Sequence, residues 1–250
     1  MLFLITNDDG HQALGLKVLA EILGALGEVV TVAPEIEQSA CSHSITLDRP
    51  LRVRSLGPGS YAVNGTTTDC VLLASQSLLE DKRPDAVFSG INHGPNLGDD
   101  VTYSGTVAGA FEGTLLGVRS LAISAGDKER IGDNKIQPIL ADLLDRLLSR
   151  PWPKDVLLNI NIPPSKIPIH GVRMTTLGRR HYAETVIEKT DPRGRKYYWI
   201  GGMNPHWYGD EYSDFKAVDE GYISVTPLHL DLTHYSSLKG FKKFEFDLDP

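Results

Sequence analysis

The chain begins with an uninterrupted apolar segment, Leu2-Phe3-Leu4-Ile5, that leads directly into Thr6-Asn7-Asp8-Asp9-Gly10. A short apolar run followed by turn residues is typical of a strand that is buried on both faces. Asp8 and Asp9 then stand at the carboxyl end of that strand, where open α/β sheets bind ligands. Two adjacent carboxylates repel each other and lose solvation, which favours a hard divalent cation between them. The alternative is that one aspartate caps the following helix and the other faces water.

Strand and helix signals alternate through residues 1–168. Further strands are predicted over residues 28–33, 61–63, 85–89, 121–124 and 156–162, and helices over residues 14–26, 71–79, 106–116 and 133–148. Such alternation implies parallel strands joined by right-handed helical crossovers, so we expect an α/β fold with a doubly wound sheet. Residues 34–50, which include Ser39, form a long loop of a kind that is usually functional or disordered.

The pattern changes in residues 169–250. Strands are predicted over residues 171–176, 184–189, 197–200 and 222–226, whereas residues 231–250 show no clear pattern. Asp191-Pro192-Arg193-Gly194 is a good turn sequence and joins two of these strands in a hairpin. Tyr197-Tyr198-Trp199 gives this hairpin more aromatic surface than it can bury alone, so we expect it to lie on the main domain or on a partner subunit. Residues 169–250 are predicted to be a β-rich extension and not an independent domain.

Composition excludes several classes of protein. The formal net charge of -7 over 250 residues provides no general attraction to a nucleic-acid polymer or to an anionic membrane. No stretch approaches the roughly 20 apolar residues of a membrane span, and no basic leader precedes the first strand. Cys41 and Cys70 lack a C-x-x-C spacing, so reduced thiols and a cytoplasmic location are expected.

The segment from Ser89 to Thr106 contains four glycines and two asparagines. It matches neither a P-loop nor the G-x-G-x-x-G fingerprint. It runs into a predicted helix that begins at Ser104-Gly105-Thr106, where exposed N–H groups and the helix dipole favour an anion. A serine or threonine before a helix is more often only a cap.

Oxygen ligands follow three predicted strands: Asp8 and Asp9 the first, Ser39 the second, and Asn92 and Asn96 the one that ends at Ser89. Together with the glycine-rich loop they predict a site for a metal and a phosphate. Carboxylate, hydroxyl and amide oxygens suit Mg²⁺ or Mn²⁺, whereas zinc prefers histidine or cysteine. The nearby His43 and His93 are therefore expected to support the site. Such a metal polarises a phosphoryl oxygen and activates a water.

The chain resembles the SurE survival-protein phosphatases, which act as nucleotidases, and the likeness covers essentially its whole length. The matching segments are Asn7-Asp8-Asp9-Gly10, Ser39 with Ser42-His43-Ser44-Ile45-Thr46, Val63-Asn64-Gly65-Thr66, Ser89-Gly90-Ile91-Asn92-His93-Gly94 with Asn96, Tyr103-Ser104-Gly105-Thr106-Val107-Ala108-Gly109-Ala110, Asn159-Ile160-Asn161 and Thr226-Pro227-Leu228. The chain departs from the family pattern at Cys41, where a small residue, often glycine, is expected.

The resemblance implies a Rossmann-like core and a C-terminal hairpin exchanged between subunits of a homodimer or homotetramer. It implies that the chain is a metal-dependent 5'-nucleotidase that hydrolyses nucleoside monophosphates. It leaves open whether the chain also has 3'-nucleotidase and exopolyphosphatase activity. It also implies the residues of the site. One divalent ion per subunit would be bound by Asp8, Asp9, Ser39 and Asn92, and the phosphate by Asn96, Ser104, Gly105 and Thr106.

Two other functions fit the same residues less well. A zinc-dependent deacetylase with an Asp-Asp motif needs a histidine just before the acids, where this chain has Thr6-Asn7. A non-catalytic nucleotide-binding regulator could use the same fold, and only phosphate release distinguishes it. Phosphatases that form an aspartyl phosphate place their acids as Asp-x-Asp. The adjacent Asp8 and Asp9 therefore favour metal ligation by both, with water as nucleophile.

Overall fold

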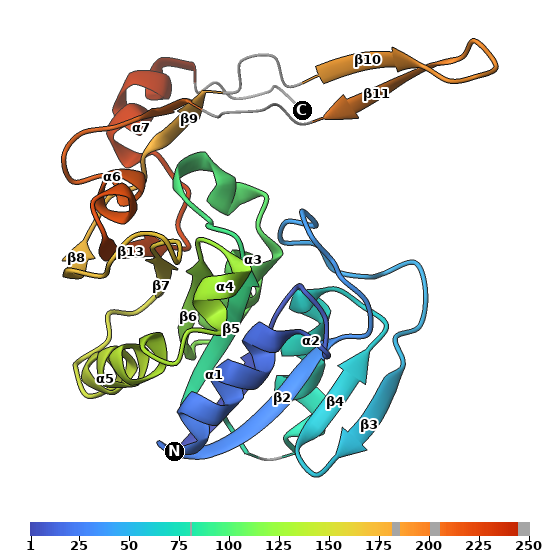
Figure 1. Cartoon of the computed structure of the whole chain (residues 1–250), viewed down its shortest axis with the longest axis vertical. Helices are drawn as coiled ribbons and strands as arrows, with labels where there is room; N and C mark the ends of the chain where they lie inside the picture. The colour runs from blue at the N-terminus through green and yellow to red at the C-terminus, as the bar shows by residue number, and fades with distance from the viewer. Residues whose placement is uncertain (81, 182–185, 201–205, 245–250) are drawn as a thin grey trace, which may run out of the picture.

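The computed structural model describes residues 1–80, 82–181, 186–200 and 206–244. Nine strands form one sheet: β1 (Leu2–Thr6), β2 (Glu28–Pro34), β3 (Val53–Gly57), β4 (Ser60–Val63), β5 (Ala86–His93), β6 (Arg119–Ala125), β7 (Val156–Ile162), β8 (Gly171–Met174) and β13 (Tyr222–His229). Their order is β3-β4-β2-β1-β5-β6-β7-β13-β8 (Figure 1). The strands from β4 to β7 in this order are parallel to one another, and only β3 and the β7–β13 pair introduce antiparallel ladders. The predicted α/β class with a mostly parallel sheet is confirmed.

The helices within the described residues are α1 (Leu14–Gly24), α2 (Thr67–Leu73) with a π-helical turn (Ala74–Leu78), α3 (Gly105–Leu115), α4 (Lys128–Ile131), α5 (Ile136–Leu148), α6 (Asp214–Asp219) and α7 (Tyr235–Phe241). Two short 3-10 turns, Gly98–Thr102 and Lys242–Phe244, precede α3 and follow α7. None of these helices is long and apolar enough to cross a membrane.

The apolar side chains of β1 divide between two cores. Phe3 and Ile5 pack with α1 and α5 in the larger core, whereas Leu2 and Leu4 pack with α2 in a second core on the opposite face of the sheet. Successive strand side chains point to opposite faces, so a strand covered by helices on both sides must be apolar at every position. This is the physical reason for the uninterrupted apolar run at the start of the chain.

Glycines at every fourth position of α3 allow it to lie directly on the sheet. A Cβ atom on Gly105 would lie 2.8 Å from the Cβ of Asp8, one on Gly109 2.7 Å from the Oγ of Ser89, and one on Gly113 2.5 Å from the Oγ of Ser120. The helix therefore runs from the carboxyl end of β1 across the middle of β5 to the start of β6, at a distance that side chains would prevent. This close approach brings the first turn of α3 to the end of β1.

The C-terminal part of the chain adds to the same sheet. β13 pairs antiparallel with β7 and parallel with β8, so two of the four strands predicted here extend the main sheet. The other two form the hairpin of β10 (Val186–Thr190) and β11 (Lys196–Ile200), with the expected turn at Asp191 to Gly194. Residues 184 and 185 of the predicted hairpin lie outside the described residues. β9 (Arg179–His181) and β12 (His206–Tyr208) form another two-stranded ladder that the sequence pattern did not indicate.

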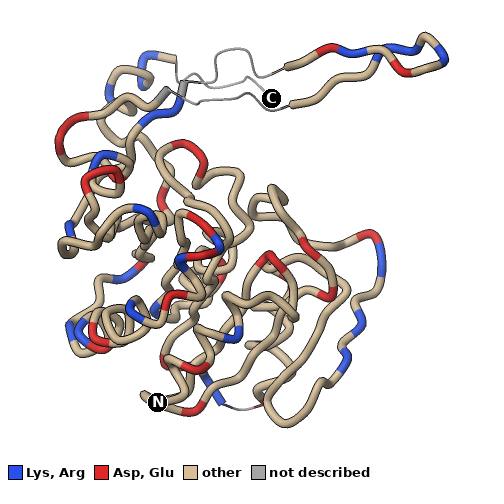
Figure 2. The backbone as a smooth tube through the Cα atoms, viewed as in Figure 1, with Lys and Arg blue, Asp and Glu red and all other residues tan. Residues whose placement is uncertain are grey.

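The hairpin of β10 and β11 extends away from the sheet (Figure 1) and, within the described residues, pairs with no other strand. Its apolar side chains are exposed, including Trp199 at 63% and Ile200 at 87%. Acidic and basic residues are interspersed along it, as they are along the rest of the backbone (Figure 2). An arm with this much exposed apolar surface is typical of an interaction segment.

Candidate active site

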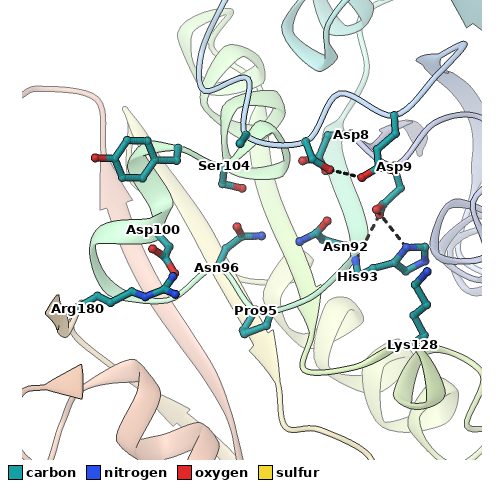
Figure 3. A pocket seen from close by; sticks show the side chains of 14 residues that line it. Asp8, Asp9, Asn92, His93, Pro95, Asn96, Asp100, Ser104, Lys128 and Arg180 are labelled. Atoms are coloured by element: carbon teal, nitrogen blue, oxygen red, sulfur yellow. Dashed lines mark hydrogen bonds and ion pairs between the residues drawn. The ribbon is translucent and has the colours of Figure 1, made fainter. Parts of the chain in front are cut away.

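A cavity of about 460 Å³ lies where β1 and β5 end and α3 begins (Figure 3). Six of the eight residues predicted to form the site line it: Asp8, Asp9, Ser39, Asn92, Asn96 and Ser104. The structure thus brings together side chains that are up to 96 residues apart in the sequence. Parallel strands place their carboxyl ends at one edge of the sheet, which is why residues after successive strands converge there.

Asp8 is buried, with only 4% of its surface exposed. The Thr106 hydroxyl donates a hydrogen bond to Asp8 Oδ1. Burial raises the pKa of Asp8 to about 6, the Thr106 hydrogen bond opposes this shift, and the neighbouring charge of Asp9 adds to it. A carboxylate in this position is short of positive charge, so the site favours a cation.

Asp9 faces His93 at the other side of the cavity. The imidazole Nδ1 lies 3.1 Å from Asp9 Oδ1, and the His93 backbone N–H donates to Oδ2 at 3.3 Å (Figure 3). Burial raises the pKa of Asp9, and His93 acts in the opposite direction. The contacts orient the Asp9 carboxylate, which fits the supporting position expected for this histidine.

Asn92 and Ser39 complete the predicted set of oxygen ligands. The Asn92 amide nitrogen donates to the Gly94 carbonyl oxygen at 2.9 Å, so its amide group is held by its own loop. Ser39 is exposed, and its hydroxyl donates to Glu37 Oε1 at 2.6 Å. Both side chains retain oxygen lone pairs for a further contact.

The loop that carries Ser39 is fastened to the opposite wall of the cavity. Ser42 donates from its backbone N–H to the Tyr103 carbonyl oxygen at 3.0 Å and from its hydroxyl to the Thr102 carbonyl oxygen at 2.7 Å. The His43 imidazole lies 2.8 Å from the carboxylate of Glu112, which is buried in α3. The second histidine of the sequence prediction therefore anchors the loop and does not line this cavity.

Asn96 is positioned by the paired asparagines of β7. Its backbone N–H donates to Asn161 Oδ1 at 2.8 Å, and its carbonyl oxygen accepts from Asn159 Nδ2 at 2.8 Å and from Asn161 Nδ2 at 3.0 Å. Its side-chain amide donates to Ser124 Oγ at 2.7 Å. These contacts give the Asn159-Ile160-Asn161 segment a physical role, because alternate residues of a strand lie on the same face.

Ser104 is the N-cap of α3, and its Oγ accepts a hydrogen bond from the Val107 N–H at 3.0 Å. The Ser104 hydroxyl hydrogen and the first N–H groups of the helix remain for an anion at this end of the cavity. Thr106 is fully buried and its hydroxyl is directed to Asp8. Of the predicted phosphate contacts, the Gly105 and Thr106 contacts would therefore come from the backbone.

Sequence reasoning missed four charged residues that line the cavity: Glu37, Asp100, Lys128 and Arg180. Arg180 Nη1 lies 2.5 Å from Asp100 Oδ2, and the Arg180 backbone N–H donates to Asp99 Oδ2 at 2.9 Å. Lys128 enters from α4, on the side of Asp9 and His93 (Figure 3). No spacing in the sequence linked these residues to the two aspartates.

The donor set can be compared with what a divalent metal requires. Within the described residues, no group of three or more His, Cys, Asp and Glu side chains is arranged to hold a metal ion. The candidate set consists of two carboxylates with an amide and a hydroxyl oxygen, which suits a hard cation that keeps several waters. The raised pKa of the buried Asp8, beside the charge of Asp9, supports this fit.

The fold and the cavity define an α/β protein with a doubly wound sheet and an acidic site at the carboxyl ends of its parallel strands. Residues 3–184 match the family described as Survival protein SurE. The "5'-nucleotidase SurE" of Gemmatimonas aurantiaca is 52% identical over 242 residues, which are 94% of each chain. That of Pelobacter propionicus is 49% identical over 243 residues, which are 96% of this chain and 97% of the relative. The crystal structure of the SurE protein from Aquifex aeolicus superposes with a TM-score of 0.86 at 43% identity, over 98% of this chain and 99% of that one. The chain belongs to the SurE family.

Proposed function

We propose that the chain is a 5'-nucleotidase that hydrolyses nucleoside monophosphates to a nucleoside and phosphate with the help of one divalent metal ion. The observation that carries this proposal is the meeting of the Asp8 and Asp9 carboxylates with the first turn of α3 in one cavity. One side of the cavity attracts a cation and the other an anion, as phosphoryl transfer needs. The curated relatives named 5'-nucleotidase SurE support the same reaction.

Asp8, Asp9, Ser39 and Asn92 would hold Mg²⁺ or Mn²⁺. The bound ion would supply Lewis-acid chemistry to a phosphoryl oxygen and lower the pKa of a coordinated water. The Ser104 hydroxyl, the Asn96 amide and the N–H groups of Gly105 and Thr106 would bind the phosphate and stabilise charge on its equatorial oxygens.

Other contacts of this chain prepare the site before substrate binds. Thr106 holds one carboxylate, His93 orients the other, and Asn161 holds the backbone of Asn96. We assign the attack to water and not to an aspartate, because Asp8 and Asp9 are adjacent and lack the Asp-x-Asp spacing of phosphatases that form an aspartyl phosphate. Activity toward 3'-nucleotides and short polyphosphates is part of what the assay below should measure.

The proposal also concerns location and assembly. Cys41 and Cys70 are free thiols, which supports a cytoplasmic location. We propose that the exposed hairpin of β10 and β11 is exchanged between subunits of a homodimer or homotetramer, because its apolar side chains are exposed in the part of the chain that the structure describes.

The test is release of inorganic phosphate from 5'-AMP, 3'-AMP and a short polyphosphate by the purified protein, with Mg²⁺, Mn²⁺ or Zn²⁺ added after treatment with chelator. Activity should disappear with chelator and return with Mg²⁺ or Mn²⁺. The Asp8→Asn and Asp9→Asn variants should each lose most of kcat, and rapid quench with labelled substrate should trap no phosphoprotein. Nucleotide binding without phosphate release would instead identify a regulator. Return of phosphate release with zinc alone would contradict the assignment of Mg²⁺ or Mn²⁺ to the site.

A further inference from the structure

Lys128 lies on a short helix that is held unusually firmly. Arg130 of the same helix is only 5% exposed, and its guanidinium donates to the carbonyl oxygens of Pro163, Pro164 and Ile167 at 2.7 to 2.9 Å. It also pairs with Asp133 at 3.0 Å. A buried arginine that satisfies several backbone carbonyls fixes the segments that carry them.

The residue before Lys128 is fixed as well. Asp127 accepts hydrogen bonds from the backbone N–H and the hydroxyl of Ser165, each at 2.8 Å, and from the Arg130 backbone N–H at 2.8 Å. At the adjoining end of β6, the Ala125 carbonyl oxygen accepts a hydrogen bond from the Gly94 N–H at 2.9 Å. The backbone at Lys128 is therefore tied both to the loop after β7 and to the loop after β5. Its side chain starts from a rigid point at the edge of the cavity (Figure 3).

The charged side chains that line the cavity are mostly acidic. Four carboxylates line the cavity, those of Asp8, Asp9, Glu37 and Asp100, against the two cations Lys128 and Arg180. Arg180 is paired with Asp100. Among the ion pairs of the described residues, none includes Lys128. A phosphate monoester brings close to two further negative charges at neutral pH, and one divalent ion offsets only part of the total.

We propose that Lys128 is a substrate-binding residue whose ammonium group contacts the anionic phosphate of the substrate from the Asp9 and His93 side of the cavity. This inference rests on the proposed nucleotidase function. The lysine and the first turn of α3 would then contact the phosphate from two sides. The anchoring by Arg130 and Asp127 fixes the backbone at Lys128, so that the ammonium group of this exposed side chain stays within reach of the cavity.

The experiment compares Lys128→Gln with Lys154→Gln. Lys154 is exposed and precedes β7, so it lies at the opposite edge of the sheet and controls for the loss of one positive charge. Binding of inorganic phosphate is measured by calorimetry with Mg²⁺ in the buffer. Lys128→Gln should bind phosphate about fivefold more weakly than the wild type, as expected for one partly exposed charge contact. The loss should shrink at high salt, and Lys128→Arg should recover most of the affinity.

Kinetics provide the second measurement. With AMP as substrate, Lys128→Gln should raise KM by a similar factor and change kcat by less than about twofold, because the contact is made in ground state and transition state alike. The inference is overturned if Lys128→Gln and Lys154→Gln bind phosphate equally well, or if the wild type binds none. Because the calorimetry does not depend on turnover, it still tests the role of Lys128 if AMP is not hydrolysed, a result that would refute only the proposed function.

Discussion

Replacing Gly105 by alanine should separate the chemistry of the site from the stability of the fold. The new Cβ would lie 2.8 Å from the Cβ of Asp8 and 2.9 Å from its Oδ2. Since carbon atoms pack at about 3.5 Å or more, Asp8 or the start of α3 must move by about 0.7 Å. Overpacking of this kind typically costs about 1–3 kcal/mol, and because Gly105 is the first residue of α3, the helix propensity of alanine offsets little of this cost. We therefore expect a loss of about 1–3 kcal/mol in the free energy of unfolding.

The loss of activity should be much larger. Displacing a catalytic group by about 1 Å reduces the rate by about 100-fold, and the hydrogen bond from Thr106 of α3 couples any shift of the helix to Asp8. We expect kcat/KM for AMP to fall by about this factor in Gly105→Ala, measured as phosphate release beside urea unfolding of the same samples. Gly24→Ala is the matched control, because a Cβ atom there meets nothing within 4 Å. A Gly105→Ala enzyme with kcat/KM within about threefold of the wild type would refute the close approach of α3 to Asp8.

Two further predictions concern stability and assembly. The pKa of Asp8 is raised by burial to about 6 in the folded protein, so its contribution to stability is present near pH 4 and is lost as the pH rises through 6. Metal-free Asp8→Asn should therefore exceed the wild type in free energy of unfolding by up to about 3 kcal/mol at pH 8 and match it near pH 4, as measured by urea unfolding. Equal pH profiles of the two proteins would contradict this. Deleting residues 186–200 should reduce the assembly to monomers or cause aggregation, as measured by sedimentation velocity; an intact protein that sediments as a monomer at micromolar concentration would contradict an exchanged hairpin.

The parallel strands of the core were predictable because a strand that is buried on both faces has an uninterrupted run of apolar residues. The run Leu2 to Ile5 is apolar at each position since α1 and α2 cover both sides of β1. β3 had no such signal, because an edge strand with exposed side chains needs no apolar pattern. The short helices α6 and α7 offer too few turns for a periodicity to be recognised.

The same reasoning explains which site residues the sequence revealed. Asp8 and Asp9 directly follow a recognisable strand, so their position could be inferred from local pattern alone. Lys128 enters the cavity because Arg130 reaches carbonyl groups more than 30 residues away, a long-range contact that no local spacing encodes. The glycines of α3 were a usable signal, since their spacing of four places all of them on one helix face.

The candidate site has a rigid part around Asp8 and a less constrained part around Ser39. Asp8 follows the central strand β1 and contacts the first turn of α3. A shift of Asp8 would therefore disturb the packing of this strand and this helix. Ser39 lies in an exposed loop whose position depends on Ser42 and on the pair of His43 with Glu112. The fold therefore fixes the positions of the two carboxylates even without a bound metal, although their negative charges repel each other. The position of Ser39 instead depends on exposed hydrogen bonds, which water can replace. Changes in the loop should act first on metal affinity, and changes at the strand end on the chemistry itself.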